Sequence, residues 1–387
     1  MMDPRRIYSF YIPTRIVFGA DSSKTAGVEL RGLGGRKALV VTDKGIEKAG
    51  LLKGILESLD KAEMGWTVFN GVEPNPTIPC VEASLDTYRR EGCDCLLAVG
   101  GGSSMDTAKA TGVLVANGGK ITDYEGMNKV EKALPPYVAV PTTCGTGAEA
   151  TYFAVITDPA RKFKFAVGSD KQLPRVALVD PLLLVNLPGP IVASTGMDAL
   201  THAVESYLNI DHQPICDALD LQAIKMIGRY LRPAVANGNL EAIANMVLAS
   251  TIAGMGFTIT RVTIVHAMSH PISAHAGVPH GVANAILLPY AMEWNVIGMP
   301  ERYADIAQAL GEDTYGLTTM EAAHLAVEAV RELSADVGIP RTIGEVGISE
   351  EMLPILADDA SKSGTVPLNP RRVTRDDLYN IYKTALG

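Results

Sequence analysis

The feature that most constrains the fold is a change of pattern near residue 187. Before it, short apolar runs rich in β-branched residues alternate with stretches of helical periodicity. The apolar runs span residues 37–43, 65–72, 95–102, 137–143 and 175–181. Runs this short and this apolar are typical of strands buried on both faces of a parallel sheet. The segments between them, such as 51–59 and 77–91, would be the helical crossovers that parallel strands require. An α/β domain is therefore predicted.

After NLPGP (186–190) the strand-like runs stop and long helical patterns take over. Apolar positions recur at helical spacing over 217–231, 237–250 and 321–338, and Thr374 with Asp377 predicts a capping box for the last helix. A chain of 387 residues is also too long for one ordinary core. We therefore expect an α/β domain over 1–187 and an all-helical domain over 188–387.

The amino-acid composition limits the classes of molecule that the protein is expected to bind. The formal net charge of −9 argues against a nucleic-acid or anionic-membrane partner, since either requires clustered Lys and Arg, so a small-molecule substrate is expected. Five scattered cysteines are too few for a disulfide framework and favour a reducing cytoplasm. The N-terminal stretch lacks the apolar core of a signal peptide, and we expect no run of about 18 apolar residues to span a bilayer.

Two glycine-containing loops follow predicted strands. In LLAVGGGSSMDTAKA (96–110) a strand passes through three glycines into a helix, so that free backbone N–H groups and the helix dipole could hold a pyrophosphate. The spacing matches neither GxGxxG nor the P-loop, and a serine-capped turn is the alternative. PTTCGTGAEAT (141–151) presents three threonine hydroxyls, although such loops also occur without a ligand. Both loops fall at the carboxyl ends of strands, where α/β sheets bind ligands.

Asp43 ends the first strand of this set. Its carboxylate could accept a hydrogen bond from a ribose 2′-hydroxyl and would repel a 2′-phosphate, which favours NAD over NADP. The alternative is that Asp43 is the N-cap of a helix beginning at Lys44, and the sequence does not decide between the two.

Histidines gather in VHAMSHPISAHAGVPHG (265–281), which contains four of the seven in the chain. His266 and His270 are four apart on a helix that Pro271 is expected to end or kink, and His280 follows in a turn. Asp198 and His202 have the same spacing upstream, where a surface ion pair is the alternative. Three imidazoles and a carboxylate without cysteine suit a catalytic Fe(II) or Zn(II) site. Spacing alone does not show which histidines are ligands.

Together these segments resemble the iron-containing, or group III, alcohol dehydrogenases. The similarity lies in VTDKG, EPNPT, GGGSSMDTAKA, PTTCGTGAEAT, LVDP, TGMDALTHAVESY and HAMSHPISAHAGVPHGVANAILLPYAMEWN, with NPR at 369–371, in the order of that family. The resemblance implies a Rossmann-like dinucleotide-binding domain and a helical metal-binding domain, in a dehydroquinate synthase-like architecture. It also implies NAD, Fe(II) with Zn(II) as a possible substitute, and a homo-oligomer of two or more subunits.

Carried over residue by residue, the resemblance implies metal ligands at Asp198, His202, His266 and His280. His270 matches a family histidine near the nicotinamide and becomes a candidate proton relay, whereas His275 falls at a variable position. The implied cofactor-binding residues are Asp43, Asn75, Gly101, Gly102, Ser103, Asp106, Thr142, Thr143, Thr146 and Lys164.

The implied reaction is hydride transfer between a small primary alcohol or diol, or the matching aldehyde, and nicotinamide. A bound cation would lower the pKa of the alcohol hydroxyl and polarise the aldehyde carbonyl. Two alternatives keep the same fold: a zinc polyol dehydrogenase of the glycerol type, and a dehydroquinate synthase-like lyase that uses NAD transiently. A non-catalytic sensor of NAD or metal is a third.

Overall fold

The computed structural model describes residues 5–161 and 163–387 and divides into two compact units. One comprises Tyr11–Thr143 and Gly147–Asn186. The other is mostly Leu187–Gly387 and also takes in Cys144–Thr146 and the described part of the first ten residues. The first unit is α/β and the second is helical, so the predicted fold class is confirmed.

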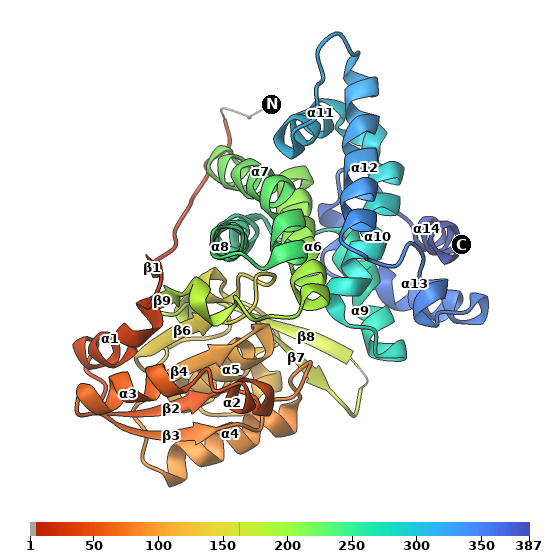
Figure 1. Cartoon of the computed structure of the whole chain (residues 1–387). Coiled ribbons are helices and arrows are strands. Elements are labelled where there is room, and N and C mark those ends of the chain that lie inside the picture. The colour runs from red at the N-terminus through yellow and green to blue at the C-terminus, as the bar shows by residue number, and fades with distance from the viewer. Residues whose placement is uncertain (1–4, 162) are drawn as a thin grey trace. The chain divides into compact units, whose positions relative to one another are not determined.

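The α/β unit is built on a six-stranded sheet in which every neighbouring pair of strands is parallel. Its strands are β1 (Arg15–Phe18), β2 (Lys37–Val41), β3 (Gly65–Phe69), β4 (Cys95–Gly100), β6 (Tyr137–Pro141) and β9 (Val176–Val179). Their order is β1-β9-β6-β4-β2-β3 (Figure 1). Strands β2, β4 and β6 are therefore neighbours, and the loops after them leave from the same edge of the sheet.

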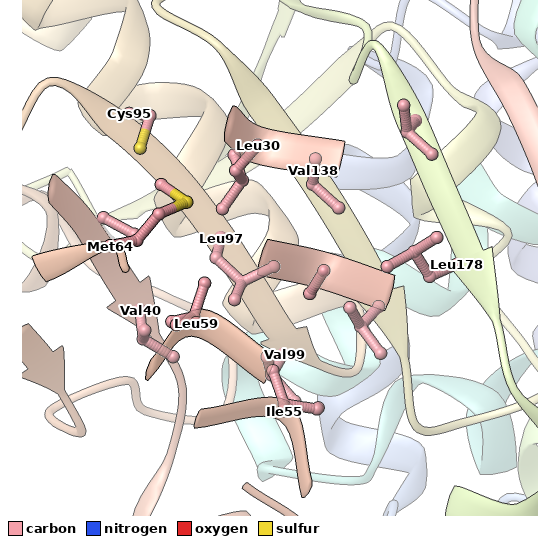
Figure 2. Close-up of a cluster of buried hydrophobic side chains, with 14 of the residues drawn as sticks. Leu30, Val40, Ile55, Leu59, Met64, Cys95, Leu97, Val99, Val138 and Leu178 are labelled. Atoms are coloured by element: carbon pink, nitrogen blue, oxygen red, sulfur yellow. The ribbon is translucent and has the colours of Figure 1, made fainter. Parts of the chain in front are cut away.

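Helices cover both faces of this sheet. On one face α1 (Ala26–Gly32) and α3 (Lys53–Lys61) pack on Val40, Leu97 and their neighbours, which Figure 2 shows as a continuous apolar cluster. On the other face α4 (Ile78–Arg90) and α5 (Gly102–Asn117) pack on Leu39, Leu96 and their neighbours. Successive strand residues point to opposite faces, so burial on both sides requires an unbroken apolar run.

A second, three-stranded sheet was not expected from the sequence. It contains β5 (Gly126–Met127), β7 (Phe153–Asp158) and β8 (Phe163–Gly168) in the order β5-β8-β7, with β7 and β8 antiparallel. Residues of β7 alternate between half-buried and buried, so this hairpin lacks the continuous apolar run that marks the parallel strands.

The helical unit confirms the predicted all-helical pattern (Figure 1). Its helices are α6 (Gly189–Leu208), α7 (Pro214–Asn237), α8 (Leu240–Thr260), α9 (Ile264–Ala276), α10 (His280–Asn295), α11 (Pro300–Leu310), α12 (Thr319–Asp336), α13 (Leu353–Ser361) and α14 (Arg375–Leu386). The predicted capping box of Thr374 and Asp377 begins α14. Of the two outcomes expected for Pro271, an end of the helix is wrong, because α9 continues to Ala276, and a kink stays a prediction. Pro271 removes one backbone hydrogen bond, but it is buried together with Ile272, and this packing holds the helix.

Helix α8 is the one helix among the described residues that is long and apolar enough by composition to cross a membrane. It is 21 residues long. Within the helical unit α8 packs against α6 and α7, and 67% of its most apolar window is buried. This degree of burial is typical of a core helix in a helical bundle.

Candidate metal centre and nucleotide-binding loops

Three helices of the helical unit bring the histidine-rich segments together. Asp198 and His202 lie one turn apart on α6, His266 lies on α9, and His280 begins α10. One ligand atom each of Asp198, His202 and His266 lies within 4.8 Å of the others, and all three residues are buried. The Nε2 atom of His280 is 3.9 Å from Oδ1 of Asp198. All four residues named as ligands from the resemblance therefore lie in one cluster.

Burial favours a neutral imidazole at His202. Burial lowers the pKa of His202 to about 4, against the opposing effect of the Asp198 carboxylate. The His202 ring also stacks on Phe257 of α8, with ring centroids 4.3 Å apart. A buried, neutral imidazole keeps a lone pair available at neutral pH, as a metal ligand must.

Asn284 lies at the centre of this cluster and was missed in the sequence. It is one turn after His280 on α10, and its Nδ2 is 2.7 Å from Oδ1 of Asp198. The same nitrogen is 3.1 Å from Nε2 of both His266 and His280. A carboxylate can only accept, so Nδ2 must be donating, and it donates toward the point on which these ligand atoms converge. The spacing of four between His280 and Asn284 was a signal that could have revealed it.

The converging atoms fit a divalent transition metal. The amide nitrogen of Asn284 lies among one carboxylate oxygen and two imidazole nitrogens, which are atom types that can bind a cation. Three imidazoles with one carboxylate and no thiolate form a donor set suited to Fe(II) or Zn(II).

Glu205 is a second residue that the sequence analysis missed. It lies on α6 with its side chain 3% exposed, and its Oε2 is 2.5 Å from Nδ1 of His266. Its Oε1 accepts hydrogen bonds of 2.6 Å from the Thr263 hydroxyl and from the Val265 backbone N–H. Burial by itself would raise the pKa of Glu205, but the donors around the carboxylate lower it below its usual value.

The two remaining histidines of the cluster segment differ in their surroundings. His270 is half-buried one turn after His266, and its ring centroid is 5.2 Å from that of His280. His275 is exposed near the end of α9, where its Nε2 is 2.9 Å from Oδ2 of Asp359 on α13. His270 therefore adjoins the candidate metal site, whereas His275 makes a surface ion pair when protonated.

In the α/β unit the two glycine-containing loops lie side by side, because β4 pairs with β6. Gly100 has φ +155°, and a Cβ there would lie only 2.3 Å from the Ser104 hydroxyl oxygen. Gly101 caps α5 without a side-chain hydrogen bond, which leaves the first turn, with Gly102 and Ser103, open to an anion.

Threonines of the second loop face the first one. A Cβ on Gly101 would lie 3.3 Å from Oγ1 of Thr143. The Oγ1 of Thr142 is buried and has no hydrogen-bond partner among residues 5–161 and 163–387. Thr146 belongs to the short Cys144–Thr146 segment of the helical unit, where the Cys144 sulfur lies 3.3 Å from the Thr195 hydroxyl of α6. The structure thus places Thr142 and Thr143, but not Thr146, in the α/β unit.

Asp43 is an N-cap. Its Oδ1 accepts hydrogen bonds from the N–H groups of Gly45 (2.7 Å) and Ile46 (3.0 Å) at the start of α2 (Lys44–Lys48). Its Oδ2 points toward the glycine loop, 3.8 Å from the position of a Cβ on Gly100. One oxygen therefore caps the helix, and the other can still meet a ribose. The two interpretations of Asp43 do not exclude each other.

The other residues named for the cofactor have protein partners. Lys164 on β8 donates to Oδ1 of Asn75 over 2.8 Å, and burial lowers the pKa of Lys164 to about 8. Asp106 on α5 accepts the N–H of Val155 on β7 over 3.1 Å, and it lies near the buried Lys109. The contact of Asp106 in this structure is thus with the second sheet.

The whole chain matches one family. Residues 13–181 match the family model described as iron-containing alcohol dehydrogenase, and residues 192–386 match the C-terminal model of the same family. The chain is 43% identical to the 1,3-propanediol dehydrogenase of Citrobacter freundii, over 98% of this chain and 99% of that protein. It is 41% identical to the NAD-dependent methanol dehydrogenase of Bacillus methanolicus, over 98% of this chain and 100% of that one.

A crystal structure of 1,3-propanediol oxidoreductase is similar with a TM-score of 0.96 and 42% identity, over 98% of this chain and 100% of that one. These similarities agree with a chain that has a parallel α/β unit and a helical unit containing a buried histidine–carboxylate cluster. The chain belongs to the iron-containing alcohol dehydrogenase family and is an alcohol oxidoreductase.

Proposed function

We propose that this protein interconverts a small primary alcohol or diol and the corresponding aldehyde, with NAD as the hydride carrier and a divalent metal held by Asp198, His202, His266 and His280. The observation that carries the proposal is the convergence of buried imidazole and carboxylate ligand atoms within one cluster. The similarity to a propanediol dehydrogenase and to an NAD-dependent methanol dehydrogenase supports a short alcohol and NAD.

The cofactors and the side chains of the protein have different roles in the proposed reaction. When bound, the cation supplies Lewis acidity toward the substrate oxygen, and NAD supplies the hydride acceptor. The ligand residues keep the site neutral enough to accept the cation, since His202 stays unprotonated through the neutral range. The apolar ring of Phe257 covers one face of His202 and excludes water from it.

We assign the dinucleotide to the loops at the carboxyl ends of β2, β4 and β6. Backbone N–H groups at the start of α5 and hydroxyls of the 141–151 loop would bind the pyrophosphate and ribose. Asp43 would repel a 2′-phosphate, which makes NADP the poorer cofactor. Lys164 and Asn75 are assigned to the nicotinamide and adenosine parts, and Asp106 acts through the position it gives α5. These residues are, in full, Asp43, Asn75, Gly101, Gly102, Ser103, Asp106, Thr142, Thr143, Thr146 and Lys164.

His270 is the proposed proton relay. Its ring adjoins that of His280. His270 is only half-buried, so its ring can exchange protons with solvent. A ring nitrogen of His270 would take the hydroxyl proton of the alcohol and release it to water, and it would return a proton when the aldehyde is reduced.

The metal is proposed to be Fe(II), with Zn(II) as a substitute that the same donor set would accept. We also propose a homo-oligomer in the cytoplasm. The cysteines support the compartment, because all five are free, buried thiols. The strongly exposed apolar side chains of Ile7 and Tyr11 support an association of subunits, which light scattering of the purified protein would measure.

Turnover and metal content measured on one sample test the proposed function. Purified protein is assayed for lasting NADH formation with a panel of short primary alcohols and diols, and its iron and zinc are determined by elemental analysis. We expect His266→Ala to lose bound metal and turnover together. His324→Ala, a half-exposed histidine on α12, is the matched control and should keep both. Full turnover by His266→Ala without metal would refute the assignment, and the absence of lasting NADH would favour the lyase.

A further inference from the structure

The Glu205 carboxylate contacts both the proposed metal site and the start of α9. Its Oε2 contacts Nδ1 of His266, while its Oε1 accepts from Thr263 and from the backbone of Val265. The carboxylate is buried, so each of these contacts is made away from solvent. Nothing in the proposed reaction uses this residue directly.

The hydrogen bonds around His266 define which of its nitrogens carries the proton. On one side, a carboxylate oxygen 2.5 Å from Nδ1 can only accept, so Nδ1 carries a proton. On the other side, Nε2 lies 3.1 Å from the donating amide nitrogen of Asn284, so Nε2 presents its lone pair. Both neighbours require the same tautomer, and Nε2 is the atom that faces Asn284, whose Nδ2 also donates to Asp198.

We propose that Glu205 is a positioning residue of the metal centre: by accepting the Nδ1 proton of His266, it fixes the tautomer and ring orientation in which Nε2 binds the cation. Carboxylate partners of a histidine ligand commonly raise the affinity of a site for its metal by about 10–100-fold. The inference rests on the proposed metal site, to which it adds a residue outside the ligand set.

A purely structural role is the alternative, because Glu205 also caps a helix. Helix α9 begins at Ile264, its N-cap Thr263 makes no side-chain cap hydrogen bond, and Glu205 accepts the N–H groups of Val265 and His266 instead. A carboxylate at a helix N-terminus stabilises the helix whether or not a metal is present. The two roles differ in what they predict for metal affinity.

Glu205→Gln separates the two roles. The N–H of Val265 needs an acceptor, so the amide oxygen of the new side chain must stay on that side and its NH₂ group must face His266. Nδ1 would then have to accept, which moves the imidazole proton to Nε2, the proposed ligand atom. Thr263→Val is the matched control, because it removes one hydrogen bond from the same carboxylate without touching His266.

The measurement is the dissociation constant for Zn²⁺, obtained on metal-stripped protein in competition with a chromophoric chelator, alongside the melting temperature of the stripped protein. We expect Glu205→Gln to bind Zn²⁺ about 10–100-fold more weakly than wild type. Thr263→Val should melt at a lower temperature but bind Zn²⁺ with unchanged affinity. A lowered melting temperature with unchanged affinity in Glu205→Gln would overturn the proposal and leave only the capping role.

A second measurement on the wild-type protein covers the case in which Glu205→Gln does not fold. Histidine labelled with ¹⁵N in the metal-stripped protein should show one buried imidazole with a strongly hydrogen-bonded Nδ1 proton and an unprotonated Nε2. Protonation of Nε2 in that ring would refute the proposal. Failure of the proposed site is distinguishable, since wild-type protein would then bind no Zn²⁺ tightly, whereas failure of this inference leaves wild-type binding intact.

Discussion

Asp220 on α7 is a fully buried carboxyl group whose titration should control how the helical unit responds to pH. Its Oδ2 accepts a 2.5 Å hydrogen bond from the Ser206 hydroxyl, and its Oδ1 has no hydrogen-bond partner within the described chain. Oδ1 lies so close to α8 that a Cβ on Gly256 would be 2.0 Å away. Burial raises the pKa of Asp220 well above its usual value, which the bond from Ser206 only partly opposes.

The raised pKa of Asp220 makes the folded protein less stable as the pH rises. Below the ordinary aspartate pKa both the folded and the unfolded chain hold the proton, and Asp220 has no effect. As the pH rises above that value, the unfolded chain ionises while the folded one does not, so stability falls until the folded pKa is reached. One proton corresponds to a slope of about 1.4 kcal/mol per pH unit. Asp220→Asn removes this slope and keeps a neutral side chain of the same shape.

Urea unfolding at a series of pH values, starting from about pH 5, would measure the effect. In a Trp66→Phe background the remaining tryptophan is Trp294 on α10, so its fluorescence reports the helical unit. We expect the free energy of unfolding of Asp220→Asn to decline with pH less steeply than that of wild type, by about 1.4 kcal/mol per unit at the start of the series. Asp376→Asn, which removes an exposed carboxyl group, should leave the slope unchanged. Parallel curves for Asp220→Asn and wild type would refute the reasoning.

Three further predictions concern the site. Competition with a chromophoric chelator should show that His280→Ala weakens Zn²⁺ affinity by more than the roughly 10–100-fold expected for a residue behind a ligand, whereas His275→Ala should leave the affinity unchanged; equal losses would contradict the assignment. Asp43→Asn keeps an N-cap but loses the charge, so the kcat/KM ratio of NADP to NAD should rise about fivefold or more, since unit charges about 4 Å apart repel by about 1 kcal/mol even in water. An unchanged ratio would leave Asp43 only its cap. Calorimetric NAD affinity should fall as the pH rises through about 8, where Lys164 loses its charge, and Lys164→Arg should flatten the profile. A profile identical to wild type would exclude Lys164 as the titrating group.

The parallel sheet and the helical half could be predicted because their signal is local. A strand buried on both faces must be apolar at every position, and a helix in a bundle must repeat its apolar residues along one side. The hairpin of β7 and β8 was missed for the opposite reason, since its residues alternate in burial and dilute that signal. For Pro271 a local rule left an end and a kink of the helix both open, and only the structure showed that α9 continues beyond it.

Residues of the candidate metal site could also be predicted only where the signal was local in the sequence. Asp198 and His202 could be paired from their spacing, and Asn284 could have been found by its spacing from His280. Glu205 could not, because its partner His266 is 61 residues away and the contact exists only where α6 meets the start of α9. The N-cap role of Asp43 was also undecided until the structure showed that Oδ1 caps α2, and its role toward a ribose stays a prediction.

The composition of α8 has a consequence for how this chain is made. A helix this apolar is a hazard while it is uncovered, since an exposed segment of that kind adheres to membranes and to other unfolded chains. The helices that cover it, α6 and α7, precede it in the chain, so both are available when α8 leaves the ribosome. The order of these three helices along the chain therefore limits how long α8 is exposed during synthesis.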